Sequence, residues 1–158
     1  MSRFKDVMEG WGYLGAFMGI VILIMSNSTK AEVYVGATAG PLPVGAGGMG
    51  ITVELNRRSY YGAFDYMQIQ TKHSENFGAQ PFIRLGKNFF EDNPVYLKGG
   101  VCITNEANEI VGSQLMFNVG VGLNLPWNMR AEWSHCSTAE IKKPNYGYDA
   151  IILKWRLP

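Results

Sequence analysis

The stretch LMFNVGVGLNL, residues 115–125, decides the fold class of this 158-residue chain. All of its odd-numbered positions are apolar, whereas its even-numbered positions carry Asn, Gly and one Met. Successive side chains of a β-strand point to opposite faces, so a period of two indicates a strand. A helix would instead repeat its apolar positions every three or four residues. Residues 115–125 therefore predict a strand whose two faces lie in different environments.

The same alternation recurs along most of the chain after residue 31. It is clean in four other segments and less regular in two, and one more segment completes a set of eight. No helical pattern of useful length follows residue 31. Short turns alternate with longer polar connections rich in Gly and Pro, which is typical of an antiparallel up-and-down barrel. The predicted strands are residues 33–39, 49–56, 60–70, 79–87, 95–104, 114–125, 127–138 and 151–157.

The first 31 residues have a different character. Arg3 and Lys5 precede an apolar run centred on residues 14–25, and polar residues follow up to Ala31. This order is typical of a helical signal peptide, here residues 1–31, with residues 32–158 as the barrel domain. A membrane anchor is the alternative. We favour the signal peptide because a helix of twelve apolar residues spans only about 18 Å of the ~30 Å hydrocarbon layer.

The composition excludes several classes of function. The chain is 47% hydrophobic and 17% charged, with a net charge of +1. It is too apolar for a disordered chain, and it lacks the basic excess that nucleic-acid binding requires. Cys102 and Cys136 are too few for a zinc site, and we expect no metal and no cofactor. One predicted strand separates them, so we expect two free buried thiols, since a Cα separation above about 7 Å forbids a disulfide.

The polar faces of the strands distinguish a membrane barrel from a soluble, lipocalin-like barrel. A soluble barrel exposes its polar face and would carry many Lys and Glu residues there. Here Gly, Thr, Asn and Tyr predominate, which suits a narrow interior in which Arg130 and Glu132 would pair. Trp127, Trp133 and Trp155 suit aromatic girdles at the membrane interfaces. We predict an all-β, eight-stranded antiparallel outer-membrane β-barrel, with a soluble barrel for an apolar ligand as the alternative.

The hairpin centred on Lys142 carries the candidate catalytic residues. His135 and Ser137 are two apart on a strand, so they share a face with their Cα atoms about 6.6 Å apart. A loop centred on Lys142 pairs Asp149 with His135, which brings their Cβ atoms within about 5.5 Å. Nucleophile, base and carboxylate are the parts of a serine triad. All three share the apolar parity and are predicted to face lipid at the loop end, or else to be rim residues that contact water and headgroups.

This hairpin resembles the lipid A 3-O-deacylases of Gram-negative outer membranes. HCSTAE, residues 135–140, and KKPNYGYD, residues 142–149, are similar to the family's His-x-Ser-Asn-Ala-Gly, Lys-x-Pro-Asn-x-Gly and following acidic residue. The resemblance implies an eight-stranded barrel with a lipid-facing site. It implies that Ser137 attacks the ester at position 3 of lipid A, with His135 as the general base. Asp149 stands in place of the family's usual Glu.

The resemblance also implies residues that bind the oxyanion or the substrate, namely Thr138, Ala139, Asn145 and Gly147. Thr138 stands where the family has Asn, and Glu140 where it has Gly. Loss of one oxyanion donor typically costs about 10²–10³ in rate. The implied partner is lipid A or lipopolysaccharide in the outer leaflet of the cell outer membrane, and a homodimer is among the assemblies that the sequence leaves open. The alternative function is a non-enzymatic outer-membrane barrel for adhesion or membrane integrity.

Overall fold

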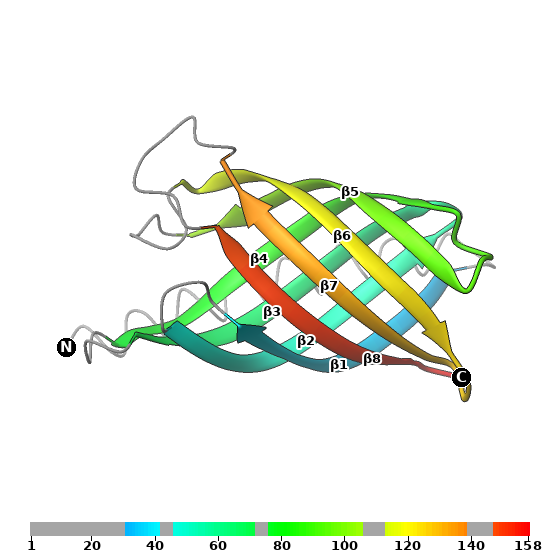
Figure 1. Cartoon of the computed structure of the whole chain (residues 1–158), viewed down its shortest axis with the longest axis horizontal. Helices are drawn as coiled ribbons and strands as arrows, with labels where there is room; N and C mark the ends of the chain where they lie inside the picture. Colours follow the sequence, from blue (N-terminus) through cyan, green and yellow to red (C-terminus); the bar gives the residue numbers. More distant parts are fainter. Residues whose placement is uncertain (1–30, 42–45, 72–75, 106–112, 139–146) are drawn as a thin grey trace.

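The computed structural model describes residues 31–41, 46–71, 76–105, 113–138 and 147–158. In these residues eight antiparallel strands follow one another around a closed barrel, and β8 pairs with β1 to close it (Figure 1). The predicted eight-stranded up-and-down barrel is therefore confirmed. The strands are β1 (Ala31–Pro41), β2 (Ala46–Arg57), β3 (Tyr60–Thr71), β4 (Asn76–Phe89), β5 (Val95–Thr104), β6 (Leu115–Leu125), β7 (Met129–Ser137) and β8 (Tyr148–Arg156).

The alternating sequence of β6 builds a wall with an apolar outside and a polar inside. From Leu115 to Leu123 its residues alternate strictly between exposed and buried. The exposed positions carry Leu, Phe and Val, whereas the buried ones carry Met116, Asn118 and two glycines. One of these, Gly122, leaves room for an aromatic ring, because a Cβ there would overlap the Tyr96 side chain. The same parity on the other strands gives the barrel an apolar exterior.

Short turns connect the strands at one end of the barrel. Between β6 and β7, Met129 N donates to the backbone oxygen of Pro126 at 3.3 Å. The two residues enclosed by this bond, Trp127 and Asn128, both have φ near 60°, as a type I′ turn requires. For this reason β7 begins at Met129 and not at residue 127, where the sequence pattern placed it. β1 begins and β8 ends at this short-turn end (Figure 1). The other four connections belong to the opposite end, which we call the loop end, and those between β5 and β6 and between β7 and β8 are the longest.

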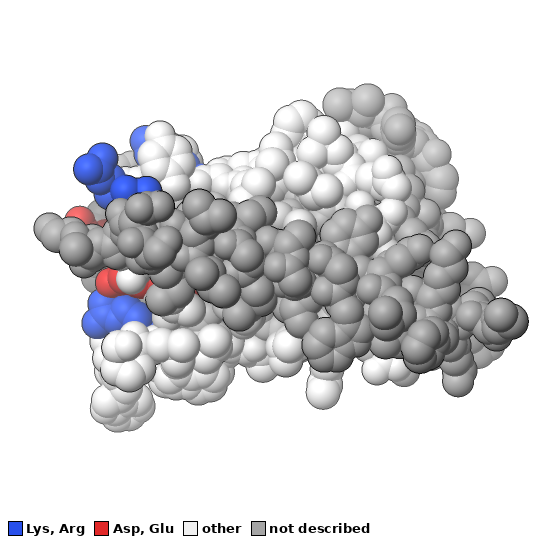
Figure 2. Space-filling model, turned by 180° about the vertical axis from the view of Figure 1, so that it is seen from behind, with Lys and Arg blue, Asp and Glu red and all other residues white. Residues whose placement is uncertain are grey.

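The outer wall exposes large hydrophobic side chains of β2, β4, β5, β6 and β8. On the face seen in Figure 2, the charged atoms gather at the end that holds the C-terminus, and the visible described wall beyond them carries none. Trp133 and Trp155 lie on the outer faces of β7 and β8, and Trp127 is 86% exposed at the turn between β6 and β7. A closed barrel with an exterior of this kind fits an outer-membrane protein.

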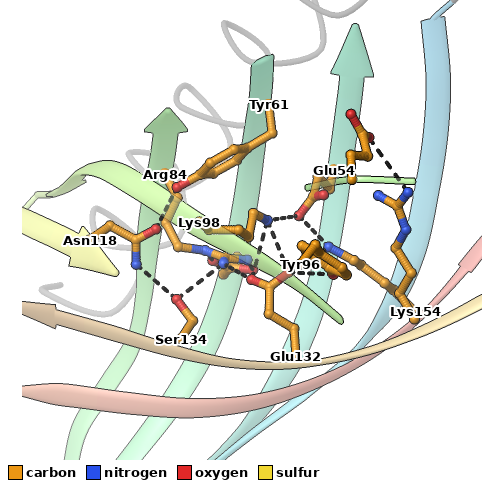
Figure 3. Close-up of polar contacts among 12 residues, drawn as sticks. Glu54, Tyr61, Arg84, Tyr96, Lys98, Asn118, Glu132, Ser134 and Lys154 are labelled. Atoms are coloured by element: carbon orange, nitrogen blue, oxygen red, sulfur yellow. Dashed lines mark hydrogen bonds and ion pairs between the residues drawn. The ribbon is translucent and has the colours of Figure 1, made fainter. Parts of the chain in front are cut away.

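An ionic network, which we call the lumen network, fills the middle of the barrel (Figure 3). Three carboxylates and three cations meet there, and each residue is less than 5% exposed. Equal numbers of opposite charges leave this cluster without net charge. Buried charges are tolerated in proteins when they are paired in this way. The lumen network comprises Glu54, Asp65, Arg84, Lys98, Glu132 and Lys154.

Glu132 lies at the centre of the lumen network. Its carboxylate accepts hydrogen bonds from Nζ of Lys98 at 2.9 Å, Nζ of Lys154 at 2.8 Å and Nη1 of Arg84 at 2.8 Å. Tyr96 adds a hydrogen bond from its hydroxyl at 3.2 Å. β4, β5 and β8 thus each supply a cation to one carboxylate of β7.

The predicted pairing of Arg130 with Glu132 is wrong. Arg130 Nε donates to Asn124 Oδ1 at 2.8 Å, and Arg130 Nη2 lies 3.5 Å from Glu91 Oε1. Residues two apart on a strand share a face, but they lie about 6.6 Å apart along it. Arg130 therefore reaches partners near the short turns, whereas Glu132 meets the cations deeper in the lumen.

Cys102 on β5 and Cys136 on β7 form a disulfide, so the expectation of two free thiols is wrong. Both side chains are fully buried on the inner face of the barrel. Although β6 lies between the two strands, their Cα atoms are only 6.0 Å apart, within the range that a disulfide spans. Counting strands as if the sheet were flat overestimates a separation across the concave side of a small barrel.

The predicted signal peptide falls on residues 1–30, which lie outside the described residues, and on Ala31, the first residue of β1. Within the ranges given above, no helix is long and apolar enough to cross a membrane.

Candidate functional site

His135 and Asp149 meet on adjacent strands near the loop end of the barrel. They are register partners in the pairing of β7 with β8, as the hairpin centred on Lys142 predicts. His135 Nδ1 lies 3.0 Å from Asp149 Oδ1. A carboxylate at Nδ1 favours the neutral tautomer of the imidazole that carries its proton on Nδ1. Nε2 is then the ring nitrogen that can exchange a proton with a substrate or a nucleophile.

The three candidate catalytic residues share the outer face of the barrel, as predicted. His135, Ser137 and Asp149 are partly exposed, whereas their neighbours Cys136 and Tyr148 are buried. Ser137 is the last residue of β7, two positions beyond His135. The outer wall at the loop end thus carries a hydroxyl, an imidazole and a carboxylate among apolar side chains.

Two further residues hold the imidazole of His135 in place. The Trp133 indole stacks on it, with ring centroids 5.9 Å apart and an angle of 16° between the planes. Gly147 lies against the ring as well, because a Cβ at this position would be 2.6 Å from His135 Cε1. Gly147 also has a φ of +73°, which glycine adopts without strain. Together with Asp149, these contacts fix the orientation of the ring.

Neither contact was predicted from the sequence. Trp133 was assigned to an aromatic girdle, although its position two residues before His135 places both rings on one face. Gly147 was assigned to oxyanion or substrate binding, and the structure places it against the imidazole. The two-residue spacing between Trp133 and His135 could have predicted the contact between their rings. The contact of Gly147 depends on how the chain enters β8, which a motif alone does not show.

Contacts on the inner face of β7 support the part of the strand that carries His135 and Ser137. Asn118 on β6 donates from Nδ2 to Ser134 Oγ at 2.8 Å and to the backbone oxygen of His135 at 3.1 Å. The disulfide between Cys102 and Cys136 ties the same part of β7 to β5. The backbone that carries His135 and Ser137 is therefore fixed by polar and covalent contacts inside the lumen. These supporting residues were not identified from the sequence as part of the site.

The remaining predicted residues are only partly described. Thr138 follows Ser137 directly and is 5% exposed, on the inward parity of Ser134 and Cys136. Ala139 and Asn145 lie outside the described residues. The structure therefore brings together His135, Asp149 and Gly147, with Ser137 on the same face, and leaves the oxyanion assignments as predictions.

The chemistry of the site follows from its donor set. Within the described strands and turns, no group of three His, Cys, Asp or Glu side chains is placed to hold a metal ion. A His–Asp pair beside a serine on one face is the arrangement used in acyl transfer.

Comparison of the chain with protein-family models, curated proteins and solved structures finds no match.

Proposed function

We propose that this protein is an outer-membrane lipid esterase that removes the 3-O-linked acyl chain of lipid A. The observation that carries the proposal is the hydrogen bond between His135 Nδ1 and Asp149 Oδ1 on the outer, apolar wall. Ser137 lies on the same face, two residues along β7. The sequence resemblance of residues 135–149 to the lipid A 3-O-deacylases supports the choice of substrate.

The placement favours a membrane lipid over a soluble ester. Ionisable residues on a lipid-facing surface are expensive, and those that occur there are usually functional. His135 and Asp149 lie near the loop end, which is the outer-leaflet side if the short turns face the periplasm, as they do in bacterial barrels of this class. A lipid can then reach Ser137 sideways from the leaflet, without entering the lumen.

In the proposed mechanism, Ser137 Oγ attacks the ester carbonyl and transfers its proton to His135 Nε2. Asp149 stabilises the imidazolium, while Trp133 and Gly147 keep the ring in position. Collapse of the tetrahedral intermediate breaks the bond to the sugar oxygen, which takes the proton from Nε2 and leaves as the alcohol. Water, deprotonated by the same imidazole, then hydrolyses the acyl-serine and releases the fatty acid.

The oxyanion of the tetrahedral intermediate is the least conventional part of the mechanism. The resemblance assigns it to Thr138, with Ala139, Asn145 and Gly147 nearby. A Thr hydroxyl at position 138 donates a single hydrogen bond and has a shorter reach than the side-chain amide of the family's Asn. We therefore propose a slower enzyme than one with the full set of donors, since one donor is worth about 10²–10³ in rate.

The test compares wild-type barrel with Ser137→Ala and Ser59→Ala in detergent micelles that contain lipid A. Ser59 is the matched control, because it lies in the turn between β2 and β3 at the short-turn end, away from the site. The proposal predicts release of a 3-hydroxy fatty acid by wild type and Ser59→Ala, and none by Ser137→Ala. Heat-modifiable migration on gels verifies that each variant is folded.

Two results would contradict the proposal. The first is no release from wild type under conditions in which a known deacylase works. The second is release that persists in Ser137→Ala. The first result would leave a non-enzymatic outer-membrane barrel, for which the filled lumen network provides a stable core. The second would show that Ser137 is not the nucleophile.

A further inference from the structure

An open groove of about 350 Å³ lies on the outer face of β4, β5 and β6 at the loop end. It is separate from the His135–Asp149 pair, which lies on β7 and β8. Its lining is apolar along the wall and polar at the ends of the strands. We call it the β4–β6 groove; its apolar lining is Pro81, Ile83, Ile103 and Leu115, and its polar rim includes Thr104 and Gln114.

The apolar lining of this groove forms a row across three strands. Leu115 is the register partner of Ile103, and Ile103 is the partner of Ile83. Leu115 is 60% exposed and Ile103 is 38% exposed, so these side chains project from the wall. Neighbouring strands lie about 4.8 Å apart, and the row therefore extends roughly 10 Å around the barrel.

A second, parallel row begins at Ser137 itself. Ser137 pairs with Phe117, Phe117 with Val101, and Val101 with Leu85. Phe117 is two residues from Leu115 on the same outer face of β6, so the two rows run side by side. Ser137 is therefore one strand and two residues away from Leu115, which lines the β4–β6 groove.

These rows run obliquely from the loop end towards the middle of the barrel. Ser137 is the loop-end residue of β7, whereas Leu85 pairs with Gly62, which lies close to the short-turn end of β3. The obliquity follows from the tilt of the strands, which is visible in Figure 1. An acyl chain that starts at Ser137 and follows the rows would therefore run along the outer wall away from the loop end. A lipid tail runs in the same direction, from the headgroup into the hydrocarbon layer.

We propose that the β4–β6 groove binds an acyl chain of the lipid that is cleaved at Ser137, and that it makes the enzyme selective for long chains. This inference rests on the proposed function and adds the surface that recognises the tail. Along the wall, the groove itself provides aliphatic contacts only. The acyl chain passes from Ser137 over Phe117 and Leu115 into the groove, and Ile103 lies in the middle of the row that it follows.

The rim of the groove suits uncharged polar groups of the same lipid that lie near the membrane surface. Gln114 Nε2 donates to the backbone oxygen of Asn105 at 2.7 Å, and Thr104 N donates to the backbone oxygen of Gln114 at 2.9 Å. These contacts fix a rim of amide and hydroxyl groups, and the described residues that line the groove carry no charge. A neutral hydrogen-bonding rim matches ester, amide and hydroxyl groups better than phosphate.

The test uses Ile103→Trp, which narrows the groove, and Ile51→Trp as the matched control. Ile51 is also exposed on the outer wall, at 59%, but it lies on β2. Hydrolysis of p-nitrophenyl butyrate and p-nitrophenyl myristate is measured in the same detergent micelles, with Ser137→Ala as the blank. Each methylene excluded from an apolar site lowers affinity about fourfold, so displacing two lowers it more than tenfold.

The expected result is that Ile103→Trp lowers kcat/KM for the myristate ester more than tenfold, mainly through KM. The butyrate ester changes less than twofold, and Ile51→Trp changes neither. Equal effects on both esters, or no effect on the myristate ester, would overturn the groove assignment while leaving Ser137-dependent hydrolysis intact. Hydrolysis that does not require Ser137 would instead overturn the proposed function.

Discussion

Replacement of Glu132 by Gln is expected to destabilise the barrel more than any single change on its surface. The substitution keeps the size of the side chain and removes one negative charge. Lys98, Lys154 and Arg84 then face only Glu54 and Asp65, and the buried cluster acquires one uncompensated positive charge. Removing one partner from a buried ion pair typically costs about 3–5 kcal/mol.

The matched control is Glu32→Gln. Glu32 Oε1 lies 2.6 Å from Arg156 Nη1, a shorter contact than those of Glu132, but the two side chains are 37% and 41% exposed. Solvent screens such a pair, so its loss is expected to cost at most about 1 kcal/mol. Burial, and not contact distance, therefore distinguishes the two substitutions.

The assay is urea-induced unfolding in detergent micelles, followed by tryptophan fluorescence and by heat-modifiable migration on gels. Glu132→Gln should lower the unfolding midpoint far more than Glu32→Gln. Adding Lys98→Met should recover part of the loss, because it restores equal numbers of opposite charges. If Glu132→Gln costs no more than Glu32→Gln, the lumen network does not stabilise the barrel as we have described.

Three other predictions concern the site and its support. Gly147→Ala places a Cβ 2.6 Å from His135 Cε1, at a backbone φ of +73°. We expect kcat for ester hydrolysis to fall at least about tenfold, since small misplacements of catalytic groups cost that much or more. An unchanged kcat would contradict the role of Gly147 in positioning the imidazole. Asp149→Asn should lower kcat by about 10³–10⁴ while the barrel stays folded, and a rate close to wild type would show that the carboxylate does not assist His135. Replacing both Cys102 and Cys136 by Ala should lower the free energy of unfolding by about 2–4 kcal/mol, measured by urea unfolding, and an unchanged midpoint would argue against the disulfide.

The fold followed from the sequence because side-chain parity and strand count are local properties. The exposed and buried residues of β6 correspond to the two parities of LMFNVGVGLNL, and the strand boundaries differ mainly where turns begin. The pairing of His135 with Asp149 was also predictable, since a hairpin fixes its register from the centre of its loop. These inferences needed no knowledge of contacts across the barrel.

The contacts across the lumen were not predictable in the same way. The disulfide of Cys102 with Cys136 depends on the curvature of a closed sheet, which a count of intervening strands omits. Glu132 pairs with cations from three other strands, whereas the sequence suggested its own neighbour Arg130. Such pairings depend on which inward side chains meet at one height, a property of strand tilt and stagger.

The most direct test of a serine nucleophile on the outer wall is covalent labelling by a fluorophosphonate, read by peptide mass spectrometry. We expect modification of Ser137 in wild-type barrel and its loss in His135→Ala, while Ser134 inside the lumen stays unmodified. The absence of modification at Ser137, when a serine esterase in the same sample is labelled, would contradict it. So would labelling of Ser137 that is unchanged without His135.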